Sequence, residues 1–256
     1  VGIPYAMGVV VIAVVSFCYL VTAGYWGVST TDIIQGITIA VSCLLVAVIV
    51  ITKSGGVTEA VTYMGSVSPS HIQPSSGLTF AQLFSWAGVW ALIAFGQPQL
   101  VTKFMGLRDS RTVGTVIRVA VVWEIIFMVS IAMIGAAAFK LFGAVPFDNV
   151  DAIVPTLVAE HTNAVVSGIF LCGILAAGLS TTVALVLTSS GAVTKDIYED
   201  YYCARSNAKQ DSGKSVRISR FATGIILVVV VIGSIYPPDF IWSLSTMSAG
   251  VMGAAF

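Results

Sequence analysis

The chain has 256 residues, of which 57% are hydrophobic and 9% are charged, and its 12 basic and 12 acidic residues balance. An ordinary soluble domain carries about 25% charged residues, so this composition excludes that class and predicts an integral membrane protein in a lipid bilayer. The lack of net charge gives no argument for a nucleic-acid partner.

Seven apolar segments reach or approach the length of about 20 residues that an α-helix needs to cross a bilayer. We expect them to form one all-α transmembrane domain over residues 1–256. We also expect the chain to be part of a longer one, because it ends inside an apolar run. In chain order the segments cover about Pro4–Ala23, Ile33–Ile51, Leu78–Val101, Val113–Phe139, Thr162–Thr194, Phe221–Tyr236 and Phe240–Phe256.

Basic residues gather on one side of this predicted topology. Ten of the 12 flank the loops after the third and fifth segments, whereas Lys53 and Lys140 fall on the other side. Cytoplasmic loops of membrane proteins are enriched in Lys and Arg. We therefore expect a protein of the cell membrane whose basic loops are cytoplasmic and whose first segment begins outside. The ten residues are Lys103, Arg108, Arg111, Arg118, Lys195, Arg205, Lys209, Lys214, Arg217 and Arg220.

The second segment begins near Asp32, which follows Ser29, Thr30 and Thr31. An acid at the start of a helix can cap the first amide groups and is stabilised by the helix dipole. The pattern therefore favours an N-cap. The alternative is an acid that attracts cations at a cytoplasmic vestibule.

The third segment contains Trp86 and Trp90, one helical turn apart, followed by Gly96 and Pro98. Proline removes a helical hydrogen bond and clashes with the preceding turn. Interrupted backbone at membrane depth is tolerated where it lines a cavity, and such interruptions often bind ligands. A kinked helix with packing tryptophans is an equally supported interpretation.

Glu124 lies within the fourth segment. A carboxylate inside a membrane is costly, and such residues usually face protein or a water-filled cavity. We hypothesise that Glu124 faces protein, either protonated or hydrogen-bonded. Unchanged activity of a Glu124→Gln variant would exclude a role in the mechanism.

The fifth segment, Thr162–Thr194, carries no charged residue but has hydroxyl groups near its middle. Ala177, Ser180 and Thr181 share one helix face, because they stand at positions i, i+3 and i+4. Two hydroxyls and a backbone carbonyl offer the oxygen ligands that a hard cation such as sodium prefers. The more common interpretation is hydrogen bonding to the preceding turn and close helix packing.

Four motifs together resemble the sodium:solute symporter family. The run Ala176-Ala177-x-x-Ser180-Thr181, followed by Asp196-Ile197-Tyr198, resembles its sodium-site helix. Tyr19–Tyr25 leading to Thr31–Gln35 is similar to its fourth-to-fifth core-helix junction. Phe95–Pro98 with Lys103–Met105 resembles the sixth core helix of its sodium/proline branch, and Ser248–Gly250 with Gly253–Phe256 resembles the tenth.

The resemblance implies a leucine-transporter-type five-plus-five inverted repeat, incomplete in this chain, with the seven segments as core helices four to ten. It implies that the Ala177 carbonyl and the Ser180 and Thr181 hydroxyls bind sodium, with further ligands from the first core helix, which the chain lacks. Asp32 matches an acid on the route of the ion to the cytoplasm.

The resemblance also implies a substrate site. Trp90 and Pro98 match substrate-lining positions of the proline transporters, and Gln97 falls in the same motif. Ala94 stands where that branch has a tyrosine, so we expect a larger pocket that lacks one hydroxyl. Glu124 has no counterpart in the family pattern.

The implied function is sodium-coupled symport of a small organic solute, with proline or a similar amino acid as the leading expectation. The alternatives are the solute-sensing membrane domain of a transporter-like sensor kinase and a scaffold that does not transport. We expect no enzyme activity, because the sequence has no P-loop, nucleophile elbow or metal-spaced histidine cluster. It gives no indication of an oligomeric state.

Overall fold

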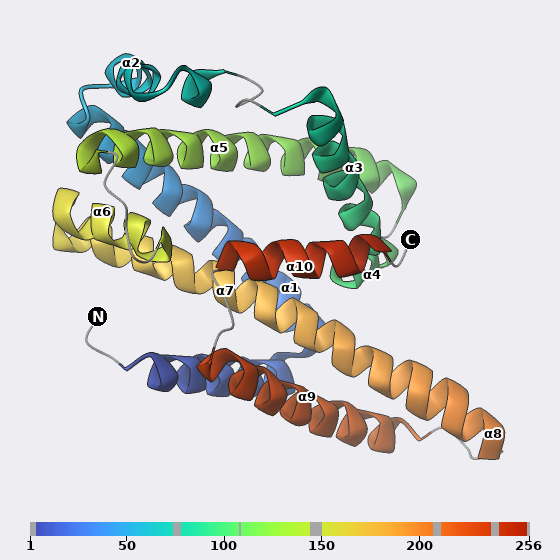
Figure 1. The fold of residues 1–256 in the computed structure, drawn as a ribbon. Helices are drawn as coiled ribbons and strands as arrows, with labels where there is room; N and C mark the ends of the chain where they lie inside the picture. Colours follow the sequence, from blue (N-terminus) through green and yellow to red (C-terminus); the bar gives the residue numbers. More distant parts are fainter. Residues whose placement is uncertain are drawn as a thin grey trace. The chain divides into compact units, whose positions relative to one another are not determined.

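The computed structural model describes residues 4–73, 78–107, 109–143, 150–206, 211–236 and 241–254 (Figure 1). These parts are helical and contain no β-strand, which confirms the all-helical class. The elements in chain order are α1 (Tyr5–Lys53), α2 (Val57–Val67), η1 (Pro69–Ile72), α3 (Phe80–Gly96), α4 (Pro98–Met105), α5 (Ser110–Phe142), η2 (Val150–Ala152), α6 (Ile153–His161), α7 (Ala164–Ala192), the π-helix η3 (Val193–Cys203), α8 (Ala204–Ser206), α9 (Ser212–Ile235) and α10 (Ile241–Ala254).

Four of the described helices are long and apolar enough to cross a membrane: α1, α5, α7 with its extension to Ser206, and α9. Large apolar side chains cover the outside of α5, for example Val119, which is 65% exposed. An exposed apolar surface of this kind suits contact with lipid rather than water. The chain is therefore a multi-pass membrane protein. Seven crossings remain a prediction, because α3 is apolar over the shorter stretch Phe80–Ile93.

A single residue, Gly24, separates the first two predicted segments. Its φ of 56° and ψ of −164° interrupt α1 with a conformation that is accessible essentially to glycine. The Tyr19 hydroxyl spans the interruption and donates to the carbonyls of Gly27 and Val28, at 3.2 and 3.4 Å. The helix thus resumes well before Asp32, so the N-cap interpretation of Asp32 is wrong.

The chain divides into two compact units, which are described separately below. Unit 1 comprises Val1–Gln35 and Ala177–Pro238, and unit 2 comprises Gly36–Ala176 and Asp239–Phe256.

Unit 1 packs the first part of α1 against the second part of α7 and against α9, which lies beside α1 (Figure 1). The core consists of apolar side chains at helical spacing from all three helices. They are Leu20, Val28, Val183, Val186 and Leu227. Beyond this core, the π-helix η3, which continues α7, is joined to α9, because the Ser215 hydroxyl donates to Glu199 at 2.6 Å.

Unit 2 has a larger core, built from α1, α2, α5, α6 and the start of α7. Its members include Val46, Val50, Ile134, Leu157 and Phe170. Glu59 of α2, which lies outside the membrane-spanning segments, accepts a hydrogen bond at 2.5 Å from Lys140 in the last turn of α5, and this lysine holds the pKa of the exposed Glu59 carboxyl below its ordinary value.

One close helix contact in unit 2 joins α1 to α7. A β-carbon placed on Gly173 would lie 2.0 Å from the hydroxyl oxygen of Ser42, so only glycine fits there without a shift. Small residues allow membrane helices to approach in this way. Part of the small-residue content of α7 therefore serves packing, as the more common interpretation predicted.

Candidate functional site

The predicted sodium-site residues form one hydrogen-bonded group on α7, here termed the hydroxyl turn (Ala177, Ser180 and Thr181). Both hydroxyls donate to the Ala177 carbonyl oxygen, each at 3.0 Å. This arrangement follows from the spacing, because residues three and four positions later lie above that carbonyl. Ser180 is half-buried, and Thr181 is exposed in the described part of the chain.

The hydroxyl turn has the donor set for a hard cation. A hydroxyl that donates its proton keeps its oxygen lone pairs for a ligand, so Ser180 and Thr181 can face an ion as they stand. The Ala177 carbonyl already receives both hydroxyls, and they must rotate before it can contact an ion. No group of three or more His, Cys, Asp or Glu side chains suited to a metal occurs among the described residues.

Asp32 lies on the same helix pair as the hydroxyl turn. Gly24 of α1 and Leu187 of α7 line one cavity, while Val28 and Val183 share the unit 1 core, so the two helices run antiparallel. Asp32 lies one turn beyond Val28, and Ser180 lies almost one turn before Val183. This register brings the half-buried carboxylate toward the level of the hydroxyl turn.

Gln35 is a polar residue in this region that the sequence analysis did not select. Its Oε1 atom is buried and has no hydrogen-bond partner among the described residues. It lies three residues after Asp32, so both side chains project from neighbouring positions on α1. The signal that could have found it is an amide within an apolar segment, where an unpaired polar atom is costly.

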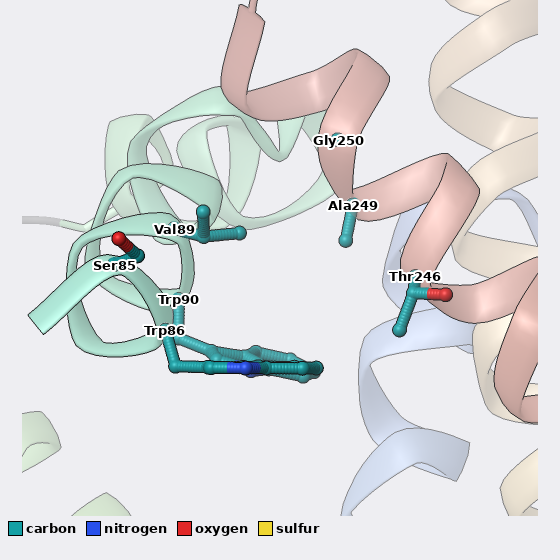
Figure 2. A pocket seen from close by; sticks show the side chains of 7 residues that line it. All are labelled: Ser85, Trp86, Val89, Trp90, Thr246, Ala249 and Gly250. Carbon is teal, nitrogen blue, oxygen red and sulfur yellow. The ribbon is translucent and has the colours of Figure 1, made fainter. Parts of the chain in front are cut away.

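The predicted substrate residue Trp90 lines a cavity of about 290 Å³ between α3 and α10, here termed the α3–α10 cavity (Figure 2). Figure 2 shows the indole rings of Trp86 and Trp90 extending from α3 toward α10, where Thr246 projects. The cavity is lined by Ser85, Trp86, Val89, Trp90, Thr246, Ala249 and Gly250. Every lining side chain is apolar, aromatic or a hydroxyl.

The predicted helix interruption lies beyond this cavity on the same segment. α3 ends at Gly96, Gln97 is extended with φ of −87° and ψ of 101°, and α4 begins at Pro98. Gln97 is half-buried and Pro98 is exposed, and neither lines the α3–α10 cavity. Ala94 lies within α3, but its side chain is outside the described residues.

Two cavity residues, Ser85 and Thr246, were absent from the sequence-based candidates. Thr246 could not be found from local pattern, because only the packing of α10 on α3 brings it opposite the tryptophans. Trp86 was noted for its spacing from Trp90, and the structure places both in one cavity.

Glu124 is exposed on α5 and lies in a groove with Trp123. The Trp123 indole donates to the Gly36 carbonyl of α1 at 3.1 Å, so Trp123 is fixed against a neighbouring helix. The hypothesis that Glu124 faces protein stays a prediction, because the described residues leave this face of α5 uncovered.

Comparisons with known proteins give one consistent result. The chain is 27% identical over 259 residues to an osmoregulated proline transporter of Bacillus subtilis (strain 168), 26% identical over 262 residues to a sodium/pantothenate symporter of Haemophilus influenzae, and 27% identical over 262 residues to a sodium/proline symporter of Escherichia coli (strain K12). Each match covers 100% of this chain but only 51–52% of the relative, so the chain spans about half the length of the curated relatives it matches.

No solved structure matches the chain significantly. The relatives are transporters rather than enzymes. The profile of the sodium:solute symporter family matches residues 1–256, from the first residue to the last. The chain therefore belongs to the sodium:solute symporter family.

Proposed function

We propose that the protein containing this chain is a sodium-coupled symporter of a small organic solute, with proline or a similar amino acid as the leading candidate. The observation that carries this proposal is the hydroxyl turn, where three oxygen atoms gather on one face of α7. Family membership and the printed names of the relatives support the same activity.

The proposed roles of the residues are those that the resemblance to the family implies. Ala177, Ser180 and Thr181 supply oxygen ligands to sodium, and segments outside this chain complete its coordination. Asp32 attracts the cation on its cytoplasmic route. Trp90, Ala94, Gln97 and Pro98 shape the solute site, where the helix interruption frees backbone groups for the solute.

The proposed architecture is a leucine-transporter-type inverted repeat of two sets of five helices, of which this chain supplies part as one transporter domain over residues 1–256. The protein lies in the cell membrane with its basic loops in the cytoplasm. Alternating access then drives uptake, because sodium shifts the conformational equilibrium only by its differential affinity for the two states.

The test replaces both hydroxyls in the complete transporter. Ser180→Ala combined with Thr181→Ala removes two of the oxygen ligands, so the sodium concentration for half-maximal uptake should rise about tenfold or more, which is about 1.4 kcal/mol of lost binding. Thr188→Ala is the matched control, because the Thr188 hydroxyl donates to the Ala184 carbonyl of the same helix at 2.9 Å. Unaltered sodium dependence in the double variant would defeat the assignment.

The same assay addresses the alternative of a solute-sensing domain. A symporter accumulates solute in proteoliposomes when an inward sodium gradient is applied, whereas a sensor binds solute without accumulating it. The relatives reported above are named as transporters, and transport is therefore the favoured function.

A further inference from the structure

Unit 1 has two hollows along the contact between α1 and α9. The first, here termed the basic cavity, has a volume of about 310 Å³, and Arg220 is the charged residue in its lining. The second, here termed the apolar groove, has a volume of about 260 Å³ and is lined by apolar side chains alone. We propose that the two hollows together bind one anionic phospholipid, with its phosphate beside Arg220 and an acyl chain in the apolar groove.

The two hollows adjoin each other because α1 and α9 run antiparallel. Residues 20–24 of α1 face the beginning of α9 in the basic cavity, whereas residues 10–17 face its later turns in the apolar groove. Leu20 of the cavity and Leu227 of the groove belong to the same buried core. Between them, a β-carbon on Gly224 would lie 3.5 Å from the ring of Phe17. One elongated ligand can therefore extend from the cavity into the groove.

The length of this path suits one leaflet of a bilayer. From Gly24 to Val10, α1 spans about 21 Å at about 1.5 Å per residue, and the hydrocarbon core of a bilayer is about 30 Å thick. Arg220 directly precedes the apolar run of α9 that begins at Phe221, so it lies at the boundary of the membrane. A headgroup held there directs its acyl chain along the groove toward the middle of the bilayer.

The charge of the cavity selects an anionic ligand. The exposed Arg220 has no ion pair or hydrogen bond with another residue in the part of the chain that the structure describes, and no Asp or Glu lines the cavity. Lys214 and Arg217 lie in the two preceding turns of α9. A guanidinium binds phosphate oxygens in a bidentate manner, and basic pockets between membrane helices bind anionic headgroups. On the proposed topology this is the cytoplasmic leaflet, whose surface is negatively charged.

The hydroxyl groups of the cavity distinguish between headgroups. Thr22 donates to the Cys18 carbonyl at 2.7 Å and Thr223 to the Ser219 carbonyl at 2.9 Å, so both threonine oxygens remain acceptors for a ligand. The glycerol headgroup of phosphatidylglycerol offers hydroxyl donors to them. The headgroup of phosphatidylethanolamine carries an ammonium, which the neighbouring Arg220 repels. Phosphatidylglycerol is therefore the expected ligand.

The first experiment uses the complete, unaltered transporter. It is equilibrated with equal amounts of phosphatidylglycerol and phosphatidylethanolamine that carry the same acyl chains, and native mass spectrometry counts the lipids that remain bound. We expect one phosphatidylglycerol to be retained with at least fivefold preference. Equal retention of the two lipids would overturn the proposal. So would retention of neither, which is the result if another segment of the complete transporter covers the groove.

The second experiment removes the charge. Arg220→Gln should lower the retention of phosphatidylglycerol at least fivefold. Arg217→Gln is the matched control, because it removes the same charge from the same helix at an exposed residue outside the lining, and retention should stay within twofold of the parent. Thermal unfolding confirms that both variants are folded. Equal losses in the two variants would mean that surface charge alone attracts the lipid, and unchanged retention in Arg220→Gln would remove the site.

The third experiment tests the acyl chain. Ala13→Phe places a ring in the apolar groove and should lower retention about as much as Arg220→Gln, whereas Val11→Phe, at a 51% exposed residue of α1 outside the groove, should not. Excess inorganic phosphate or glycerol 3-phosphate should not displace the lipid. Displacement by either, or full retention in Ala13→Phe, would indicate a site for a free phosphate group and overturn the phospholipid. None of these measurements depends on the solute or on the coupling ion.

Discussion

The chain interrupts its helices in two places by different means. In unit 1, α1 breaks at Gly24 through a positive φ of 56°, and the Tyr19 hydroxyl bridges the break to two carbonyls on its far side. In unit 2, the break between α3 and α4 depends on Pro98, before which Gln97 is extended. A side-chain hydrogen bond spans the first interruption, whereas the second has a half-buried amide side chain next to a proline.

The difference indicates different purposes. Only glycine accepts the backbone conformation at position 24, so this break is a requirement of the fold. Proline at the first position of a helix is well tolerated but is not needed for the helix to form. We therefore expect the Pro98 break to be dispensable for stability, and we propose that it shapes the solute site proposed above.

The largest expected effect comes from Gly24→Ala. A β-carbon at this φ and ψ costs about 1–3 kcal/mol of folding stability, which thermal unfolding of the complete transporter in detergent would detect. Gly8→Ala is a matched control, because it lies in the same helix, and an added β-carbon meets nothing within 4 Å at either position. It should be neutral or slightly stabilising. An equal response of both variants would contradict a fold requirement at position 24.

Pro98→Ala should give the opposite pattern. Alanine favours a continuous helix from α3 into α4, so stability should stay the same or rise while solute uptake falls about tenfold. Uptake and thermal unfolding are measured on the same preparation. Pro69→Ala, at the first turn of η1, is the control and should leave uptake unchanged. Normal solute uptake by Pro98→Ala would contradict a functional role for the interruption between α3 and α4.

Tyr19→Phe tests how much the hydrogen bonds of the Tyr19 hydroxyl stabilise the interruption, while Gly24 itself is left unchanged. The variant keeps the ring but loses the hydrogen bonds to the Gly27 and Val28 carbonyls, so it should cost about 1 kcal/mol of unfolding free energy. Tyr5→Phe, at a residue that is 61% exposed, should cost nothing measurable. If the two variants unfold alike, the hydroxyl does not stabilise the break.

The smallest expected effect on stability comes from the ion pair of Glu59 with Lys140. This pair contacts neither helix interruption, so its loss shows how much an unrelated surface interaction changes unfolding. Because Lys140 lowers the pKa of Glu59 from its ordinary 4.5, the pair stabilises the folded state above that pH. This contribution is lost as the pH falls through the lowered pKa. Glu59→Gln should therefore unfold slightly more easily than the parent near neutral pH and equally at strongly acidic pH. A difference that persists in acid would assign the effect to something other than charge.

The sequence predicted element types better than their connections. Long apolar runs dictate helices, and the seven predicted segments fall mainly within α1, α3, α4, α5, α7, α9 and α10. The start of the second segment was misplaced at Asp32, because a capping pattern there resembles a helix start, while the actual break rests on the torsion angles of one glycine. Propensity rules do not distinguish Gly24 from the helical glycines around it.

In the candidate site, too, local features were predictable from the sequence and contacts between helices were not. The hydroxyl turn was predictable, because spacing within one helix determines which oxygens meet. The contribution of Thr246 was not, because it depends on which helix packs against α3. Long-range pairing of apolar helices leaves little trace in one sequence, since lipid-facing and protein-facing surfaces are both hydrophobic.

The contact between Gly173 and Ser42 has a consequence for leakage. Where Gly173 of α7 meets Ser42 of α1 too closely for even one methyl group, no water molecule fits between the two helices, and an ion deprived of water does not enter there. The helices are closed to uncoupled flow at this point. If the proposed symport holds, sodium would travel along other faces of these helices, where its passage can be tied to the movement of a solute.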